Sequence, residues 1–323
     1  MTGVPKLAYL CPGQGAQQPG MGRAFYDEVP ETRELYQQAS KQLNYDVAAL
    51  CFEGPADLLT RTDICQPAIF VTSMAALMAL RARCSGLPQP AAMAGLSLGE
   101  FTALAAAGAL SFEDGVYLLR VRGEAMAEAS TREAGAMLAV FGPDRSAVER
   151  LCRETGTQIA NLNAPGQIVI SGPVAGIGRA ETLAKESGAR RVLRLEVSGA
   201  FHSSLMEPAG RALRKALEQV TLRAPKTPVI SNVTADYAET PEAIRENLVR
   251  QVSHPVRWEE SMRRLLAEGV NAFLEPAPGK VLSGLMRRMD AAAQTFPWEI
   301  PADLKALEVL AVPQAPSSSS LQQ

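Results

Sequence analysis

The sequence predicts an α/β protein in which a compact unit with the order βαββαβ is inserted into a larger α/β domain. Three observations support this prediction. Short apolar runs are followed by helical segments rich in Ala and Leu, and a serine lies between two glycines where one run meets such a segment. Between residues 136 and 197 the pattern changes to strand, helix, two strands about a Pro-Gly turn, helix and strand, which is the ferredoxin-like plan.

Length and composition limit the classes of function. The 323 residues are 47% hydrophobic, enough for a large core divided over one or two domains. The formal net charge of −2 gives no general basic surface, so nucleic acid is not an expected partner. No run approaches the roughly 20 apolar residues that cross a bilayer, and no basic N-terminal segment precedes a long apolar stretch. We therefore expect no membrane association.

The cysteines indicate a reduced, cytoplasmic setting. Their number is odd and they form no C-x-x-C pair, which argues against a disulfide framework and against a zinc site. The five are Cys11, Cys51, Cys65, Cys84 and Cys152.

The first predicted strand, residues 7–11, leads into the glycine-rich turn Pro12-Gly13-Gln14-Gly15-Ala16-Gln17. A nucleotide site is not supported, because Gln18 stands where the dinucleotide fingerprint has its third glycine and no Gly-Lys-Ser/Thr follows. Two interpretations stay open. The turn either lines a pocket with free backbone N–H groups and the Gln14 side chain, or is a tight structural turn.

Helices are expected next at residues 30–43, 55–59 and 66–83, before the central motif. Gly95-Leu96-Ser97-Leu98-Gly99 fits G-x-S-x-G between a strand at 91–95 and a helix at 99–110. In a nucleophile elbow of this kind the glycines permit a sharp turn that exposes the serine hydroxyl. The motif alone also fits a glycine-flanked serine in an ordinary strand–helix turn.

A helix from Ser111 to about residue 130 follows, with an N-cap serine and acids in its first turn. It carries Arg120 and Arg122, and arginines on such a helix are commonly surface charges or halves of ion pairs. The inserted unit comes next. Its strands are expected at residues 136–141, 158–163, 167–171 and 191–197, and its helices at 144–154 and 174–186.

Only two histidines could supply a base of ordinary pKa near 7 for the serine. His202 lies where the inserted unit returns the chain to the larger domain, a location that favours a cleft. A buried structural histidine is the alternative there. His254 precedes Pro255 and fits an exposed loop.

The remaining elements continue the α/β pattern. Strands are expected at residues 228–233 and 271–275, and helices at 205–220, 241–251, 258–268 and 280–289. The pattern is then lost, and the serine-rich segment from about Pro313 is expected to be mobile.

Five separated motifs, in this order, resemble those of the malonyl-CoA:acyl carrier protein transacylases. They are Pro12-Gly13-Gln14-Gly15-Ala16-Gln17, Gly95-Leu96-Ser97-Leu98-Gly99-Glu100, Arg122-Gly123, Gly199-Ala200-Phe201-His202-Ser203 and Pro255-Val256-Arg257-Trp258. The resemblance extends from about residue 7 to about residue 289. It implies an α/β-hydrolase-like large subdomain at residues 1–130 and 199–300, an inserted ferredoxin-like small subdomain at 131–198, and a tail at 301–323.

The resemblance also implies roles for individual residues. Ser97 would be the acyl nucleophile and His202 its base, while Arg122 would bind the malonyl carboxylate. The backbone amides of Gln14 and Leu98 would form the oxyanion hole. In this family a main-chain carbonyl orients the base, and the matching stretch here begins at Gln251. Phe201 before the histidine is typical of malonyl-using rather than methylmalonyl-using acyltransferases.

The implied reaction moves a malonyl group from malonyl-CoA to the phosphopantetheine thiol of acyl carrier protein. A serine ester can accept the acyl group from one thiol and donate it to the other. We expect no metal and no cofactor beyond these substrates, and a monomer. Carrier proteins are usually acidic, so docking is expected on a basic rim, for which the candidates are Arg191, Lys280, Arg287 and Arg288.

The sequence departs from the family in two places. Leu96 stands where the family usually has a histidine before the nucleophile, which we interpret as a retuned pocket. Glu275-Pro276-Ala277-Pro278-Gly279-Lys280 replaces a more usual Gly-Pro-Gly-Lys turn, which we interpret as loop variation.

Other functions remain possible from the sequence. A serine thioesterase or hydrolase would have a carboxylate partner for His202 and no need of Arg122, and a non-catalytic carrier-binding relative would not need the intact trio of Ser97, His202 and Arg122. A trans-acting polyketide acyltransferase differs only in its carrier.

Overall fold

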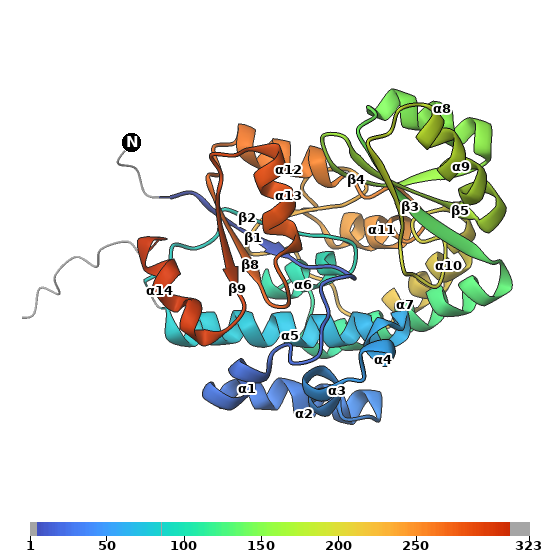
Figure 1. Cartoon of the computed structure of the whole chain (residues 1–323). Helices are drawn as coiled ribbons and strands as arrows, with labels where there is room; N and C mark the ends of the chain where they lie inside the picture. The colour runs from blue at the N-terminus through green and yellow to red at the C-terminus, as the bar shows by residue number, and fades with distance from the viewer. Residues whose placement is uncertain (1–4, 85, 311–323) are drawn as a thin grey trace, which may run out of the picture.

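The computed structural model describes residues 5–84 and 86–310, which form two separate β-sheets (Figure 1). The first sheet has five parallel strands in the order β7-β2-β1-β8-β9. These strands are β1 (Leu7–Cys11), β2 (Ala92–Gly95), β7 (Val229–Ile230), β8 (Ala272–Pro276) and β9 (Gln294–Trp298).

Both faces of the parallel sheet are buried, as expected when helices cover each side. Because successive side chains of a strand point to opposite faces, Leu7, Tyr9 and Cys11 join one apolar cluster while Ala8 and Leu10 join another. The helices that cover the second face are α12 (Trp258–Ala267) and α13 (Val281–Met289).

The first face is covered by a larger set of helices. In Figure 1 the long helix α5 runs below the sheet, with α1, α2 and α3 as an outer layer beneath it. The set comprises α1 (Arg23–Glu28), α2 (Glu31–Leu43), α3 (Val47–Glu53), α4 (Ala56–Thr60), α5 (Thr62–Arg83), α6 (Gly99–Ala106), α7 (Phe112–Arg132), α10 (Glu207–Leu217), α11 (Pro241–Gln251) and α14 (Leu304–Leu307).

Helix α5 corrects one expectation. Among the residues the structure describes, it is the one helix long and apolar enough to cross a membrane, and an 18-residue stretch of it has a mean hydropathy of 1.5. Of this stretch, 78% is buried inside the protein, so its apolar side chains are covered by other elements. Burial of this kind is what a core helix shows.

The second sheet is antiparallel, with strand order β4-β5-β3-β6. Its strands are β3 (Gly135–Phe141), β4 (Gln158–Ala164), β5 (Gln167–Pro173) and β6 (Arg191–Arg194). One face packs against α8 (Arg145–Thr155) and α9 (Val174–Glu186) around Leu138, Val140 and Ile170. The order confirms the predicted βαββαβ unit within an α/β protein.

Several predicted boundaries were wrong. Helix α6 ends at Ala106 rather than near residue 110, because Gly108 has a left-handed φ of 77°. Strand β6 ends at Arg194, and the chain beyond it leaves the sheet to line a cavity with Leu195 and Val197.

Other elements were longer, shorter or missed. Helix α5 begins at Thr62, helix α10 covers Glu207–Leu217 after the 3₁₀ turn Ser204–Met206, and β7 covers only Val229–Ile230. Helices α1 and α3, strand β9 and the short helices after Pro301 were not predicted. The segment from Pro313, expected to be mobile, lies outside the described residues.

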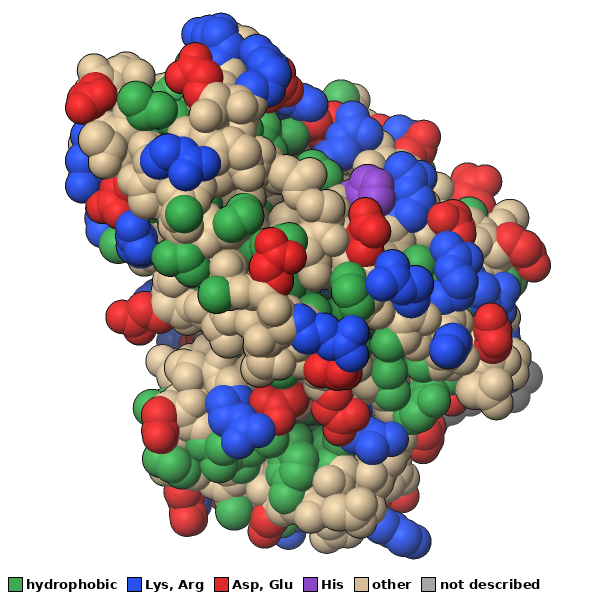
Figure 2. Space-filling view, turned by 90° about the vertical axis from the view of Figure 1, so that its right-hand side faces the viewer, with side chains coloured by type: hydrophobic (Ala, Val, Ile, Leu, Met, Phe, Trp, Pro, Cys, Tyr) green, Lys and Arg blue, Asp and Glu red, His purple; other side chains and the backbone are tan. Residues whose placement is uncertain are grey.

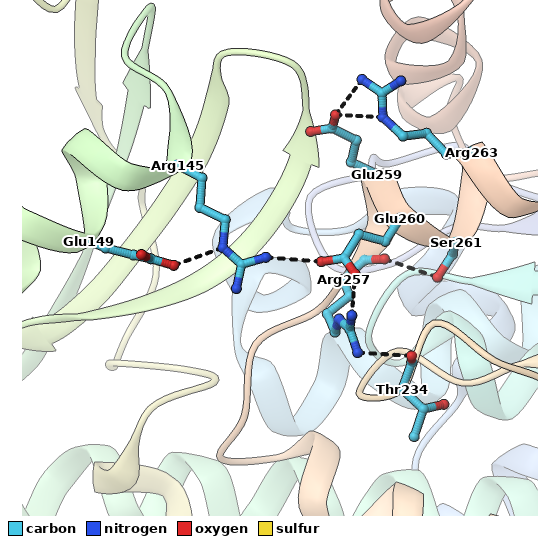
Figure 3. A network of polar contacts seen from close by, with 8 residues as sticks. All are labelled: Arg145, Glu149, Thr234, Arg257, Glu259, Glu260, Ser261 and Arg263. Carbon is cyan, nitrogen blue, oxygen red and sulfur yellow. Dashed lines mark hydrogen bonds and ion pairs between the residues drawn. The ribbon is translucent and has the colours of Figure 1, made fainter.

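The antiparallel sheet pairs with the loop before α12, beside α8. Backbone hydrogen bonds run from Leu162 N to Val256 O (2.9 Å) and from Val256 N to Ala160 O (2.8 Å), so the loop before α12 pairs in parallel with the edge strand β4. Figure 3 shows the polar network over this junction, in which Arg145 of α8 lies between Glu149 and Glu260. On the face that includes α8, basic and acidic side chains are interspersed (Figure 2).

Candidate active site

Ser97 lies in a sharp turn between β2 and α6. Its φ is 54°, a left-handed conformation that few non-glycine residues adopt. The flanking glycines are required by space, because a Cβ at Gly95 would lie 1.9 Å from Gly99 O and one at Gly99 would lie 2.2 Å from Cys11 O. The local geometry is therefore that of the predicted nucleophile elbow.

His202 contacts the serine directly. Its Nε2 lies 2.8 Å from Ser97 Oγ, and its Nδ1 lies 2.7 Å from the main-chain oxygen of Gln251 at the end of α11. A carbonyl oxygen only accepts, so Nδ1 carries the hydrogen and Nε2 is free to accept the serine proton. Burial, followed by the charge of Arg122, lowers the pKa of His202 to about 4, which keeps the ring neutral near neutral pH.

Arg122 points inward from α7, whereas Arg120 two residues earlier pairs with Glu124 nearer the surface. The Arg122 side chain is only 1% exposed. One terminal nitrogen donates to Gln66 Oε1 (2.6 Å), and the other donates to Ser97 Oγ (3.0 Å) and Gln251 Oε1 (3.0 Å). Its Nε has no hydrogen-bond partner within the described chain. Burial lowers the pKa of Arg122 to about 10, so the guanidinium stays protonated.

The Gln251 side chain holds three parts of the site together. Its Nε2 donates to Ser97 O (2.9 Å) and to Glu100 Oε2 (2.7 Å), while its Oε1 accepts from Arg122. The same residue therefore orients the base through its backbone and the arginine through its amide.

Asn232 fixes the elbow from the other side. Its Oδ1 accepts from Ser97 N (2.7 Å), and its Nδ2 donates to Gly95 O (2.7 Å). These two hydrogen bonds span the turn and hold Ser97 in its unfavourable φ.

A cavity of about 190 Å³ opens above Ser97 between the two sheets. Gln14, Leu98 and Phe201 line it together with the serine, histidine and arginine. The Gln14 side chain donates to Thr62 Oγ1 (3.4 Å), and Leu98 precedes the first turn of α6. The opposite wall comes from the antiparallel sheet and includes Met137 and Val169.

All seven residues named from the sequence therefore lie together. Leu96 also lines the cavity, in the position where the resemblance expected a histidine. His254 is exposed and lies outside the cavity lining, as its loop position indicated. No group of three or more His, Cys, Asp or Glu side chains that could hold a metal occurs in residues 5–84 and 86–310.

The sequence predicted no role for Glu100, Asn232, Gln66 or the side chain of Gln251. One signal was available for Asn232, because it follows β7, and ligands of open parallel sheets bind at the carboxyl ends of the strands. Glu100 and Gln66 gave no comparable signal, since both lie in predicted helices.

The profile of the acyl transferase domain family matches residues 8–296, most of the chain. The chain belongs to this family. The acyltransferase is 47% identical to the malonyl CoA-acyl carrier protein transacylase of Bacillus subtilis, over 91% of this chain and 93% of that protein. It is 41% identical to a polyketide biosynthesis protein of Burkholderia thailandensis, over 99% of this chain but only 26% of that protein.

Solved structures agree with these similarities. The malonyl CoA-acyl carrier protein transacylase of Coxiella burnetii superposes on the acyltransferase with a TM-score of 0.92 at 36% identity, covering 96% of this chain and 99% of that one. A malonyl-transacylase solved in complex with a type II polyketide acyl carrier protein gives a TM-score of 0.90 at 36% identity, covering 94% and 99%. The family resemblance expected from the five motifs is confirmed.

Proposed function

We propose that this acyltransferase moves a malonyl group from malonyl-CoA to the phosphopantetheine thiol of acyl carrier protein, through an ester on Ser97. The observation that carries the proposal is the buried Arg122, whose guanidinium lies 3.0 Å from Ser97 Oγ and whose Nε–H has no hydrogen-bond partner in residues 5–84 and 86–310. A malonyl group differs from acetyl by one carboxylate, and burying that charge is costly unless a cation meets it. A guanidinium can bind both carboxylate oxygens at once.

The transfer is a relay in two halves. In the first, Ser97 Oγ attacks the thioester carbonyl as its proton passes to His202 Nε2, and His202 then protonates the departing CoA sulfur. In the second, His202 takes the proton of the carrier thiol as its sulfur attacks the ester, and returns the proton to Ser97 Oγ when the ester breaks. The amides of Gln14 and Leu98 hold the oxyanion in both halves, and loss of one such donor typically costs about 3 kcal/mol.

The neighbour of His202 favours this reaction over simple hydrolysis. The hydrolase alternative calls for a carboxylate at Nδ1, whereas Nδ1 contacts the main-chain oxygen of Gln251. The narrow cavity also fits an ester that must wait for the carrier while water is excluded.

The test is the intact mass after brief exposure to malonyl-CoA without carrier. We expect the mass of one malonyl group, located on Ser97 by peptide mapping, absent from Ser97→Ala and removed when carrier protein is added. The cysteines serve as an internal control, since burial raises the pKa of Cys11 and suppresses its thiolate. Transfer of malonyl without an ester on Ser97, or a label on a cysteine, contradicts the proposal.

We further propose fatty acid synthesis as the setting, on the similarity to the Bacillus subtilis malonyl CoA-acyl carrier protein transacylase. Polyketide synthesis is the alternative, and the Burkholderia protein named for it is matched over only 26% of its length. Comparing kcat/KM for carriers of the two kinds decides between them. We also propose that the protein acts in the cytoplasm as a monomer and needs no metal or cofactor. Its subdomain boundaries are proposed to lie near residues 130 and 199.

A further inference from the structure

Glu100 is a buried acid that the acyl relay does not use. It lies in the first turn of α6, and only 1% of it is exposed. One carboxylate oxygen, Oε2, accepts both from Gln251 Nε2 (2.7 Å) and from Asn232 N (3.1 Å). Burying an ionised carboxylate is costly unless it is hydrogen-bonded and paired with an opposite charge.

Arg122 is the cation connected to Glu100, through the side-chain amide of Gln251. Gln251 Nε2 donates to Glu100, and Gln251 Oε1 accepts from Arg122 at 3.0 Å, so the amide connects the anion to the cation. No carboxylate of the described residues forms a direct salt bridge with Arg122 within 4.0 Å. Among the described residues, Glu100 is the acid whose charge raises the pKa of Arg122 against the lowering effect of burial.

We propose that Glu100 is a positioning residue that sets the preference for an anionic acyl group through Gln251 and Arg122. This inference rests on the proposed malonyl transfer. With Glu100 ionised, Arg122 is already compensated, and a malonyl carboxylate brings a net negative charge into the buried site. With Glu100 protonated, Arg122 is uncompensated and attracts the malonyl carboxylate more strongly.

The carboxyl group of Glu100 is expected to change its charge within a range of pH that experiments can reach. Burial raises the pKa of Glu100 to about 7, against the lowering effects of Gln251, Asn232, the Ser231 side chain and Arg122. The other charged groups at the site do not titrate there, because the pKa of His202 is about 4 and that of Arg122 is about 10. Malonyl preference should therefore fall as pH rises through neutrality, and malonyl binding should reciprocally raise the pKa of Glu100.

The variant Glu100→Gln isolates the charge. Because both hydrogen bonds reach the same oxygen, a glutamine carbonyl can accept both, so Gln251 and Asn232 keep their positions. Glu275→Gln is the matched control. Glu275 is also fully buried with a pKa raised to about 7 by burial, but its carboxylate accepts from the amides of Leu282 and Ser283 in α13 rather than from Gln251.

The experiment measures KM for malonyl-CoA in Ser97 acylation, and the competitive Ki of acetyl-CoA, from about pH 6 to about pH 8.5. We expect KM to rise at least about fivefold in the wild-type protein while Ki changes less than about twofold, since a coupling of this size is at the low end for linked sites. Glu100→Gln should give a KM that stays near its low-pH value, and Glu275→Gln should follow the wild type. A pH-independent wild-type KM, or a wild-type rise in Glu100→Gln, overturns the inference.

A second measurement needs no variant. Near pH 7.5, acylation by malonyl-CoA should take up more protons per ester than acylation by acetyl-CoA, read with a pH indicator in weak buffer. Equal uptake overturns the inference even if Glu100→Gln fails to fold. Absence of any malonyl ester on Ser97 at any pH is a different result, and it overturns the proposed function instead.

Discussion

At the scale of the residue, Arg122 has one contact, with Ser97 Oγ, that changes during the proposed reaction. It donates to Ser97 Oγ when no acyl group is present, and its Nε–H has no hydrogen-bond partner among the described residues. Removing one partner of a buried charge pair typically costs about 3 kcal/mol or more. Arg122→Ala should therefore lower kcat/KM for malonyl-CoA by more than about a hundredfold, and lysine should restore it only in part.

Acylation rates with malonyl-CoA and acetyl-CoA check this prediction. Arg120→Ala on the same helix is the control, since Arg120 pairs with Glu124 and lies outside the cavity lining. Full preference for malonyl in Arg122→Ala would mean that another residue binds the carboxylate.

Asn232 permits a second prediction at this scale. Asn232→Ala removes the acceptor of Ser97 N and the donor to Gly95 O, and leaves both backbone groups without these partners. The cost should be about 2 kcal/mol of the free energy of unfolding, together with slower acylation because Ser97 is no longer held at a φ of 54°. Denaturant unfolding and single-turnover acylation measure the two effects. Unchanged acylation would show that the elbow holds its shape without the amide.

At the scale of the element, α13 and the start of β5 both line the cavity. Val281 and Leu285 of α13 and Gln167 of β5 line the cavity, and Arg288 Nη1 donates to Gln167 Oε1 (2.7 Å). The basic residues named for carrier docking include Arg288 itself and its neighbour Arg287. An acidic carrier that meets this rim would be attracted by long-range charge.

Charge reversal at Arg287 or Arg191 should raise KM for the carrier severalfold and weaken its salt dependence, while malonyl ester formation on Ser97 stays normal. The control is Lys41→Glu on α2, an exposed lysine of the outer helix layer (Figure 1). If the rim variants and Lys41→Glu give the same carrier kinetics as the wild type, the carrier docks elsewhere.

The ion pairs at the junction of α8 and α12 should contribute little to the free energy of unfolding. Arg145 contacts Glu149 and Glu260, but all three side chains are between 31% and 57% exposed, and exposed pairs typically contribute less than about 1 kcal/mol. The backbone bonds between Leu162, Ala160 and Val256 are the stronger connection. Arg145→Ala should therefore lower the free energy of unfolding by less than about 1 kcal/mol, and a measured loss above about 2 kcal/mol would refute this ranking.

Helices whose first residues follow a capping side chain could be predicted from the sequence. Helix α8 begins where Asp144 Oδ1 accepts from Ala147 N (2.8 Å), and α7 begins where Ser111 Oγ accepts from Asp114 N (3.0 Å), so both starts were visible as capping residues. Strand β9 has no such signal. It contains Pro297 and pairs only with β8 at the edge of the sheet, where proline is tolerated.

At the scale of the whole molecule, the candidate site required contacts between distant parts of the chain. Ser97 and His202 could be predicted because the chemistry needs a nucleophile and a base, and the chain has only two histidines. The Gln251 amide, Asn232 and Glu100 could not, because amides and acids are common and their function depends on which segments the fold brings together.

Stability against pH is the last whole-molecule property that the buried acids control. Burial raises the pKa of Glu275 and Glu100 to about 7 from the model-compound value of 4.5, so the folded protein binds more protons than the unfolded chain between these values. Each acid therefore contributes stability that is present below about pH 4.5 and is lost as pH rises through about 7, a change of about 3 kcal/mol per group. His202 acts in the opposite direction, because its pKa is lowered from 6.5 to about 4, and its contribution is lost as pH falls through about 4.

Above pH 6.5 the histidine contribution is constant, so the two acids decide the trend. The denaturant concentration at the midpoint of unfolding should decrease as pH is raised from about 6.5 to about 8. Glu275→Gln cannot ionise, so its midpoint should fall less over the same interval, even though it starts lower because one of the two α13 amides loses an acceptor. Unfolding curves of both proteins at the two pH values measure the difference. A fall of equal size in both would show that Glu275 keeps an ordinary pKa, held down by the Leu282 and Ser283 amides against the effect of burial.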